Sequence, residues 1–506
     1  MAGVQDKPSK LISKQLRLKA NEFLTSRKNS SNLVDILNHF ESGANQSACL
    51  LTLELMFTEL LKRREMYQEI VPLKPLEEQN HEVQYRIWLR EIYDETFHKI
   101  LQCMECAKPN AQMQAFITAM KLIAWEGKYP LEPKSNEYYF PVYRLKLVIM
   151  KLLSSERNNS HLLQKFQEFS AYPDVLYHSW KLLPPITPKT HPNETFIMNY
   201  LHLVDKLPLP TEKTMDFNAD VVLCRTDDNY DFKYDEISIR RSLNKAWSCV
   251  MHWDHTPATY KQLLIVLLER ILPHLDKPLL LTDFLMDSLD MGGPVSLLAL
   301  QGVFTMIQVH NLDYPNIFTK LYSMFEPEIF HTKFKARLFY LSDLFLSSTH
   351  LPESLVAAFA KRLARLALVA PYEDVIIICM FIGNLILRHP GLKCLINHPT
   401  GGSASSDPYI MEERDPMKSN AMSSSLWEIQ TLQNHILANV ATAARFINDP
   451  LPSVEWDLSK VLDTTSNDIF DKELKKRGKE IALTFDRPLG MALPKGDKVL
   501  QYWKLF

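Results

Sequence analysis

Residues 292–327 read GGPVSLLALQGVFTMIQVHNLDYPNIFTKLYSMFEP, and this stretch decides the fold class. It holds two apolar runs of helical length, separated by the polar joint from Asn311 to Pro315. Proline fits the first turn of a helix, because the N–H that it lacks would have no partner there. Asn or Asp can cap the helix that follows. The stretch therefore predicts a helix from about Pro294, a turn, and a second helix from about Pro315.

The same proline punctuation continues on both sides of this stretch. Helix starts are predicted, in steps of 21, 16, 21, 37 and 19 residues, at Pro257, Pro278, Pro294, Pro315, Pro352 and Pro371. Within the longest step, Pro327 should end one helix near Phe325 and release another near Thr332. A helix about every 20 residues gives a helix pair about every 40, which is the spacing of HEAT-like repeats. The sequence predicts an all-α, HEAT-like helical-repeat solenoid in two halves.

Composition supports the all-α prediction. The chain has 506 residues with 13 Gly and 30 Pro. Gly is thus about 2.6% of the chain against a usual share of about 7%, which disfavours sheet-rich folds and Gly-lined phosphate sites. The 57 Lys and Arg are balanced by 59 Asp and Glu, which argues against a chain that simply coats nucleic acid.

The sequence offers little catalytic or metal chemistry. It contains no G-x-G-x-x-G, G-x-x-x-x-G-K-[ST], G-x-S-x-G or H-E-x-x-H motif. Cys103 and Cys106 form a single C-x-x-C pair, and packed cysteines are the favoured interpretation over half of a zinc site. For Cys249, His252 and His255 we favour a packed cysteine and helix-end histidines. The seven scattered cysteines and the absence of an apolar leader predict a reduced, intracellular protein.

Two apolar stretches, 291–312 and 375–387, raise a membrane alternative. The first contains Gln301, Gln308 and His310, and the second is short and contains Asn384. Polar groups in lipid are costly unless they are paired, so buried core helices are favoured. The alternative is a multi-pass nuclear-envelope protein.

Composition shifts divide the chain into five segments. A proline-rich start and an acidic end mark a linker with a short apolar helix near Phe196–Val204, and a Gly/Ser/Pro-rich stretch marks a mobile surface loop. Two helices are predicted after that loop, at 426–448 and 454–477. The predicted segments are an N-terminal helical region at 1–183, the linker at 184–236, a helical-repeat domain at 237–400, the loop at 401–425, and C-terminal helices with a tail at 426–506.

Three basic clusters are the candidate contact sites. Phosphate groups and acidic partners both need such cations, whereas the alternative for each cluster is a solvated helix face. The three clusters are Lys333, Lys335 and Arg337; Lys361, Arg362 and Arg365; and Lys472, Lys475, Lys476, Arg477 and Lys479. For the second cluster, which we place on the polar face of an amphipathic helix, an acidic partner is favoured over rRNA phosphates.

The stretch from Gly292 to Pro399 resembles a known domain. Besides the opening stretch, the resemblance rests on HTKFKARLFYLSDLFLSSTHLPESLVAAFAKRLARLALVAP at 331–371 and FIGNLILRHP at 381–390. SSLWEIQTLQNH at 424–435 and IFDKELKKRG at 469–478 extend it. These runs resemble the CCAAT-binding-factor domain of the nucleolar complex family of ribosome-assembly proteins, over roughly residues 256–478. Tyr372 stands where a second proline is expected, and Gly383 where a cysteine is usual.

The resemblance implies a function that composition alone would not give. It implies a non-catalytic scaffold without a cofactor, located in the nucleolus and acting in small-subunit ribosome assembly and 18S rRNA processing. Its implied partners are nucleolar protein 14 and other proteins of the small-subunit processome, with pre-rRNA as a further contact. The competing functions are a helical-repeat transport or adaptor protein, the nuclear-envelope protein named above, and an enzyme whose motif is not among those searched for above.

Overall fold

The computed structural model confirms the all-α prediction. It describes residues 6–43, 45–68, 81–132, 138–209, 222–224, 232–314, 316–397, 404–480 and 502. Every regular element in these ranges is a helix, and none is a strand. The chain forms two compact units, residues 1–302 and 303–506, so the division falls inside one helix, α13.

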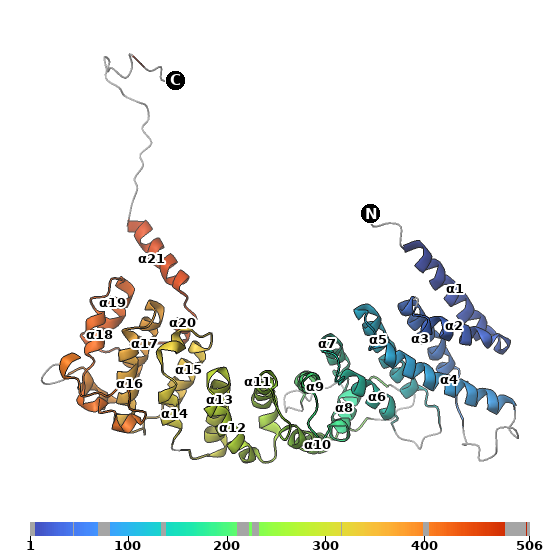
Figure 1. Ribbon diagram of the computed structural model, residues 1–506, viewed down its shortest axis with the longest axis horizontal. Helices are drawn as coiled ribbons and strands as arrows, with labels where there is room; N and C mark the ends of the chain where they lie inside the picture. Colours follow the sequence, from blue (N-terminus) through green and yellow to red (C-terminus); the bar gives the residue numbers. More distant parts are fainter. Residues whose placement is uncertain are drawn as a thin grey trace. The chain divides into compact units, whose positions relative to one another are not determined.

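The first unit is a row of helices (Figure 1). In chain order they are α1 Asp6–Thr25, α2 Ser31–Glu41, α3 Gln46–Lys62, α4 His81–Cys103, α5 Pro109–Lys128, α6 Val142–Leu152, α7 Ser160–Phe169, α8 Pro173–Ile186, α9 Glu194–Lys206, α10 Glu236–Val250, α11 Pro257–Val266, α12 Thr282–Asp290 and the first part of α13 Gly293–His310. A π-turn at Leu267–Ile271 follows α11. Helices two places apart pack on one another along the row, as in α1 with α3, α3 with α5, α6 with α8, α7 with α9, α8 with α10 and α9 with α11. This is the pattern of stacked helical pairs.

A buried aspartate binds residues 223 and 224, which lie within the predicted linker. Asp174, at the start of α8, is fully buried and accepts hydrogen bonds from the Leu223 and Cys224 amides at 3.1 and 3.0 Å, and from the Tyr138 hydroxyl at 2.6 Å. The apolar helix expected near 196–204 is α9, and it packs on α7 and α11. The prediction of a linker is therefore wrong for residues 184–207, which belong to the helical row. Residues 210–221 and 225–231 lie outside the described ranges.

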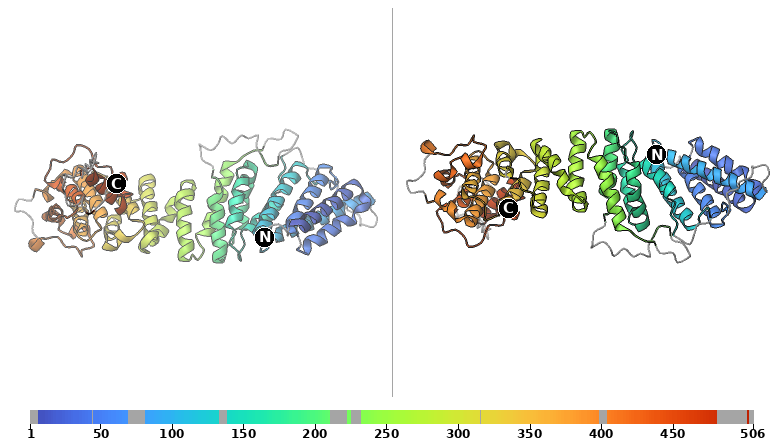
Figure 2. Two further views of the ribbon diagram at one scale, coloured as in Figure 1. Left: turned by 90° about the horizontal axis from the view of Figure 1, so that it is seen from above. Right: turned by 90° about the horizontal axis from the view of Figure 1, so that it is seen from below.

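The second unit continues with shorter helices and several 3₁₀ turns. Its helices are the rest of α13, α14 Ile317–Ser323, α15 Lys335–Phe345, α16 Glu353–Ala367, α17 Tyr372–Arg388, α18 Trp427–Leu432, α19 Ala438–Ala444, α20 Ser459–Leu462 and α21 Ser466–Glu480. Figure 2 shows this unit, coloured from yellow to red, from two further sides. Helices α16 and α17 pack on one another, and each buries more residues than α14, α15, α18 or α19.

Proline punctuation correctly predicted most helix starts. Pro257 begins α11, Pro352 and Pro371 immediately precede α16 and α17, and Pro327 opens a 3₁₀ turn between α14 and α15. Asn311, which ends α13, has a left-handed φ of 52°, a conformation that Asn tolerates better than most residues. Pro315 lies outside the described residues.

The C-terminal helices differ from the prediction. The predicted helix at 426–448 is two short helices, α18 and α19, and the one at 454–477 is α20 and α21 with a break at Asp463–Thr465. Short polar side chains accompany the second break, where they bond to nearby backbone or to one another instead of continuing a helix. Thr465, for example, bonds through its amide and hydroxyl to the Asp468 carboxylate.

The two apolar stretches at 291–312 and 375–387 coincide with α13 and α17. Within the described ranges, no helix combines the length and the apolarity needed to cross a membrane. In α17 the side chain of Asn384 is buried and exchanges two hydrogen bonds with the backbone of Trp456, at 2.9 and 2.8 Å.

Gly383 allows this contact between α17 and residue 456. A Cβ at position 383 would overlap the ring of Trp456. We therefore expect Gly383→Cys, which introduces the residue that the resemblance led us to expect, to displace the ring and cost about 1–3 kcal/mol of unfolding free energy. Urea unfolding of the full chain measures the change.

Gly478→Ala is the matched control, because nothing lies within 4 Å of its Cβ position on α21. Loss of a helical glycine there should leave stability unchanged or raise it by up to about 1 kcal/mol. Equal stability of the wild type and Gly383→Cys would show that Trp456 is not held against α17.

Candidate functional site

The second basic cluster lies on α16, which is surrounded by protein. The helix begins after Pro352, and its sequence ESLVAAFAKRLARLA places alanines and large apolar residues on every side. Its contacts include α17 on one flank and, on the other, the 3₁₀ turns of residues 416–423 and α18. The face carrying Lys361, Arg362 and Arg365 therefore meets the segment 404–428, which buries Lys361 fully and the two arginines in part.

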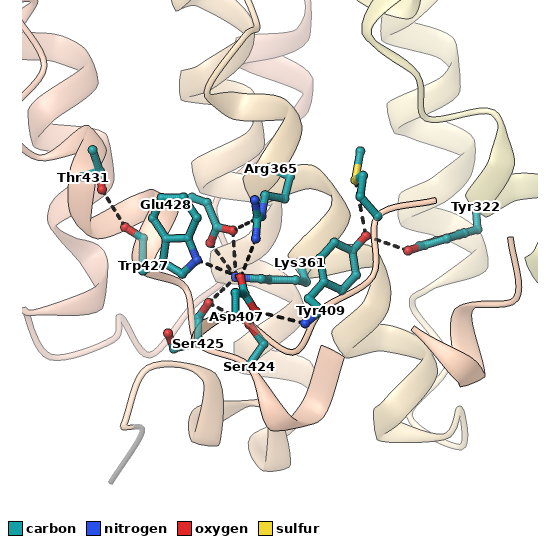
Figure 3. A network of polar contacts seen from close by, with 11 residues as sticks. Tyr322, Lys361, Arg365, Asp407, Tyr409, Ser424, Ser425, Trp427, Glu428 and Thr431 are labelled. Carbon is teal, nitrogen blue, oxygen red and sulfur yellow. Dashed lines mark hydrogen bonds and ion pairs between the residues drawn. The ribbon is translucent and has the colours of Figure 1, made fainter. Parts of the chain in front are cut away.

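Lys361 is fully buried, which corrects the prediction that this side chain lies on an exposed polar face. Its Nζ lies 2.8 Å from Asp407 Oδ2 and 2.7 Å from Glu428 Oε1, and donates to the Ser425 carbonyl at 2.5 Å (Figure 3). The side chains of both carboxylates are also buried. The spacing of apolar residues did not predict the burial of Lys361, because a charged side chain was assigned to the polar face of the helix.

Arg365 completes a buried charge cluster with Lys361, Asp407 and Glu428. It bonds to Asp407 Oδ2 through Nη2 and lies against Glu428 Oε1 through Nε, each at 2.6 Å. The indole N–H of Trp427 also donates to Asp407 at 2.8 Å, and the guanidinium stacks 4.9 Å from the Trp427 ring. Two cations face two carboxylates, so the cluster is neutral overall.

Arg362 has a different set of partners on the same helix. It donates to the carbonyls of Phe325, at 2.8 Å, and Met411, at 3.0 Å. Its guanidinium lies 4.6 Å from the ring centre of Tyr322, whose hydroxyl is 2.7 Å from that of Tyr409. Arg362 thus joins the end of α14 to the segment after Asp407.

The pKa of Asp407 reflects this environment. Burial alone would raise it, but hydrogen bonds from Lys361, Ser424 and Trp427 hold the pKa of this carboxyl well below its usual range. At Glu428 burial raises the pKa, while Lys361 and Arg365 beside it act in the opposite direction. The cluster therefore stabilises an ionised Asp407 in the folded state.

For the described residues 404–425, these contacts correct the prediction that 401–425 is a mobile surface loop. Within the described part, Tyr409, Ser419 and Ala421 are buried, and the amide of Ile410 bonds to the Ser419 carbonyl at 3.0 Å. The Ser- and Pro-rich composition reflects tight turns. The ion pair between Asp407 and Lys361 holds the segment against α16. Deletion of the segment would leave the buried Lys361 without one of its two carboxylates.

The first basic cluster is divided between structure and surface. Lys335, at the start of α15, pairs with Asp374 of α17 at 2.9 Å and Glu373 at 3.5 Å, so it joins two helices. Lys333 and Arg337 are exposed. Their predicted contact with a partner or rRNA stays a prediction.

The third basic cluster lies on α21. The side chains of Lys472, Lys475 and Lys476 are exposed, and those of Arg477 and Lys479 lie outside the described side chains. The structure brings this cluster to the closing helix of the second unit and does not place it in the buried cluster of α16.

The structure places Cys103 in the core and leaves Cys106 and Cys249 half-buried. None of the seven cysteines is in a disulfide, and within the described residues no group of three His, Cys, Asp or Glu side chains could hold a metal ion. His252 and His255 follow the end of α10, where their ring nitrogens lie 2.6 Å from the Ser248 carbonyl and 3.1 Å from the Val250 carbonyl.

Two family models match the chain. The model described as CBF/Mak21 family matches residues 296–444, which contain the whole buried cluster of α16. The model described as Nucleolar complex protein 4-like, TPR repeats matches residues 7–189. The repeat type of the first helices is thus described as TPR, where proline spacing along the middle of the chain suggested HEAT-like pairs.

Similarity to named proteins covers nearly the entire chain. Nucleolar complex protein 4 homolog A of Xenopus laevis is 38% identical over 515 residues, covering 99% of this chain and 98% of that protein. Nucleolar complex protein 4 homolog of Homo sapiens is 35% identical over 495 residues, covering 95% and 96%. The chain belongs to the nucleolar complex protein 4 family. The similarity to this family includes the N-terminal half of the chain, whereas the resemblance in the sequence was noted only for residues 256–478.

Removal of the Lys361 cation tests the buried cluster. Lys361→Met leaves the Asp407 and Glu428 carboxylates with Arg365 as their remaining cation, and breaking a buried ion pair in this way costs about 3–5 kcal/mol. We expect that loss in the unfolding free energy of the full chain in urea. Lys333→Met removes an exposed lysine and should change it by less than about 0.5 kcal/mol. Equal effects of the two changes would contradict a stabilising role for the cluster.

Asp407 gives the cluster a defined pH dependence. Because its folded pKa lies below that of the unfolded chain, its stabilising effect is present above the unfolded value of about 3.9 and is lost as pH falls further. We expect the gap in unfolding free energy between the wild type and Asp407→Asn to be constant from about pH 5 to 7 and to narrow below about pH 4. A gap that widens on acidification would contradict the assignment.

Proposed function

We propose that this protein is a non-catalytic scaffold in nucleolar maturation of the small ribosomal subunit. The observation that carries the proposal is similarity along at least 95% of the chain to vertebrate proteins named nucleolar complex protein 4 homolog. A row of helical pairs offers long surfaces for other proteins, which is what a scaffold needs. The proposed location is the nucleolus, within the small-subunit processome that handles the 18S rRNA precursor.

The proposed direct partner is nucleolar protein 14, bound by the second unit. Family-model coverage of 296–444 and the exposed basic residues of this unit support that placement. The buried cluster affects how binding of nucleolar protein 14 by the second unit can be tested. Truncation after Pro399 would remove Asp407 and Glu428 and leave Lys361 buried without a carboxylate, so loss of binding could reflect unfolding. Point changes at exposed residues avoid this problem.

Gradient sedimentation with depletion tests the proposed function. The tagged full chain should sediment with pre-ribosomal particles containing the 18S precursor, and its depletion should raise that precursor without raising large-subunit precursors. Sedimentation only at the position of the free protein, with normal 18S processing after depletion, would contradict the proposal.

Exposed cations of the first basic cluster should contribute to this association. Lys333 and Arg337 lie on the surface at the start of α15, and no carboxylate of the described residues pairs with them. We expect Lys333→Gln with Arg337→Gln to weaken pre-ribosome association several-fold at moderate salt, because both lose an anionic contact. The melting temperature should not change, since both side chains are exposed.

Arg241→Gln with Lys393→Gln removes the same charge from other exposed positions and serves as the control. Ribonuclease treatment of the particles then separates an rRNA contact, which is lost, from a protein contact, which persists. Equal association of both double variants would leave Lys333 and Arg337 as solvated residues.

A further inference from the structure

The closing helix of the second unit exposes apolar side chains that folding does not require. On α21, Phe470 is 65% exposed and Leu474, four residues on, is 61% exposed. Ile436, in the connection between α18 and α19, is 95% exposed. Contiguous large apolar side chains in water are unfavourable, and in soluble proteins such patches mark binding sites.

These side chains border a depression that we call the α21 groove. It has a volume of about 500 Å³, and its lining comes from the start of α17, the α18–α19 connection, α19 and α21, all in the second unit. Among the described residues that line it, Glu473 carries the only charge. Apolar contact, and not charge, therefore decides what binds in this groove.

The sequence of the same unit contains a strongly apolar segment, VLQYWKLF at residues 499–506. Six of its eight side chains are aliphatic or aromatic, whereas segments that stay in solution are poor in such residues. Tyr502, which the structure describes, is 80% exposed. Burial of this segment against a matching apolar surface would therefore be favourable.

The length of the connection allows this segment to reach the groove. Phe470 and Glu480, the last residue of α21, are about 15 Å apart along a helix that rises about 1.5 Å per residue. Residues 481–498 join Glu480 to the segment, and a flexible chain of that length has a root-mean-square span of about 20–25 Å. Because the span is comparable to the distance, the tethered segment has an effective concentration at the groove in the millimolar range. A segment of a separate molecule lacks this advantage.

We propose that residues 499–506 bind in the α21 groove of the same chain. Their aliphatic and aromatic side chains pack against Phe470, Leu474 and Ile436, which removes both apolar surfaces from water. A second copy of the chain, or a separate partner, has to displace a segment that is already tethered beside the groove. This inference goes beyond the proposed function and does not depend on it, since both binding surfaces belong to one polypeptide.

Photo-crosslinking of the purified full chain tests the proposal. A photo-reactive amino acid at position 470 should crosslink to residues 499–506, with a yield that does not fall on dilution. In a mixture of isotope-labelled and unlabelled chains, the two crosslinked peptides should always come from the same kind of chain. The control is the same amino acid at position 340, where Tyr340 is 55% exposed on α15 and does not line the groove, and its yield should be far lower. Crosslinks between labelled and unlabelled chains, or no crosslink from position 470 to residues 499–506, overturn the proposal.

Substitutions within the segment give a second test. We expect Trp503→Ser with Phe506→Ser to lower the crosslink yield from position 470 at least about tenfold, since large aromatic side chains carry much of the binding energy at apolar contacts. Leu489→Ser with Met491→Ser removes two apolar residues from the connection and is the matched control, with an expected yield close to that of the wild type. Equal yields from the two double variants would contradict the assignment to residues 499–506.

A labelled peptide of residues 499–506 tests the competition that the tether implies. The full chain carrying Trp503→Ser and Phe506→Ser should bind this peptide at least about tenfold more tightly than the wild type, because in the wild type the tethered segment competes for the groove. Further addition of Phe470→Ser and Leu474→Ser to that variant should abolish the binding. Peptide binding that is equal in the wild type and the first variant, or that survives the changes at Phe470 and Leu474, overturns the proposal.

Discussion

The buried ammonium group of Lys361 is the constraint on which the second unit depends. A charge in the interior is costly unless paired and hydrogen-bonded, and here two carboxylates and a carbonyl surround it. Asp407 and Glu428 come from segments 42 or more residues beyond Arg365 and Lys361. Satisfying one side chain therefore fixes the path of a long segment that has little regular structure. Arg362 extends the same linkage to α14.

This arrangement explains why the matched CBF/Mak21 region continues to residue 444. Helices α13 to α17 could be taken as a finished set of repeats, yet α16 would then present a buried lysine and a half-buried arginine to no partner. The segment 404–428 covers that face, and α18 and α19 follow from it. Once this face is closed, the exposed side chains of the described part of this unit include the cations at the start of α15 and on α21, and the apolar Phe470 and Leu474.

Sequence patterns predicted the fold class well because the relevant physics is local. Few glycines, apolar periodicity and prolines at Pro257, Pro352 and Pro371 depend on backbone geometry within one helical turn, and these helices formed as predicted. The site depended on long-range pairing instead. Lys361 and Arg365 were predicted to face an external acidic partner, because the carboxylates that they meet lie in a Ser- and Pro-rich segment of this chain that resembles a loop. One sequence signal could have revealed this cluster. The run at 424–435, which was quoted for its resemblance, contains Trp427 and Glu428. The spacing of Phe470 and Leu474 predicts one face of a helix, but it does not tell whether that face is buried in a core or exposed. Only the structure shows that both side chains are exposed.

Hydrogen exchange of the full chain tests the role of Lys361 most directly. The Ile410 amide bonds to the Ser419 carbonyl and the Leu426 amide to the Leu395 carbonyl, so both report on whether the segment is held in place. In Lys361→Met these amides should lose protection, while those of α3 and α5 in the first unit should exchange as in the wild type. Unchanged protection at Ile410 and Leu426 would show that the segment is held by its own turns, and that the buried charge is not what the second unit depends on.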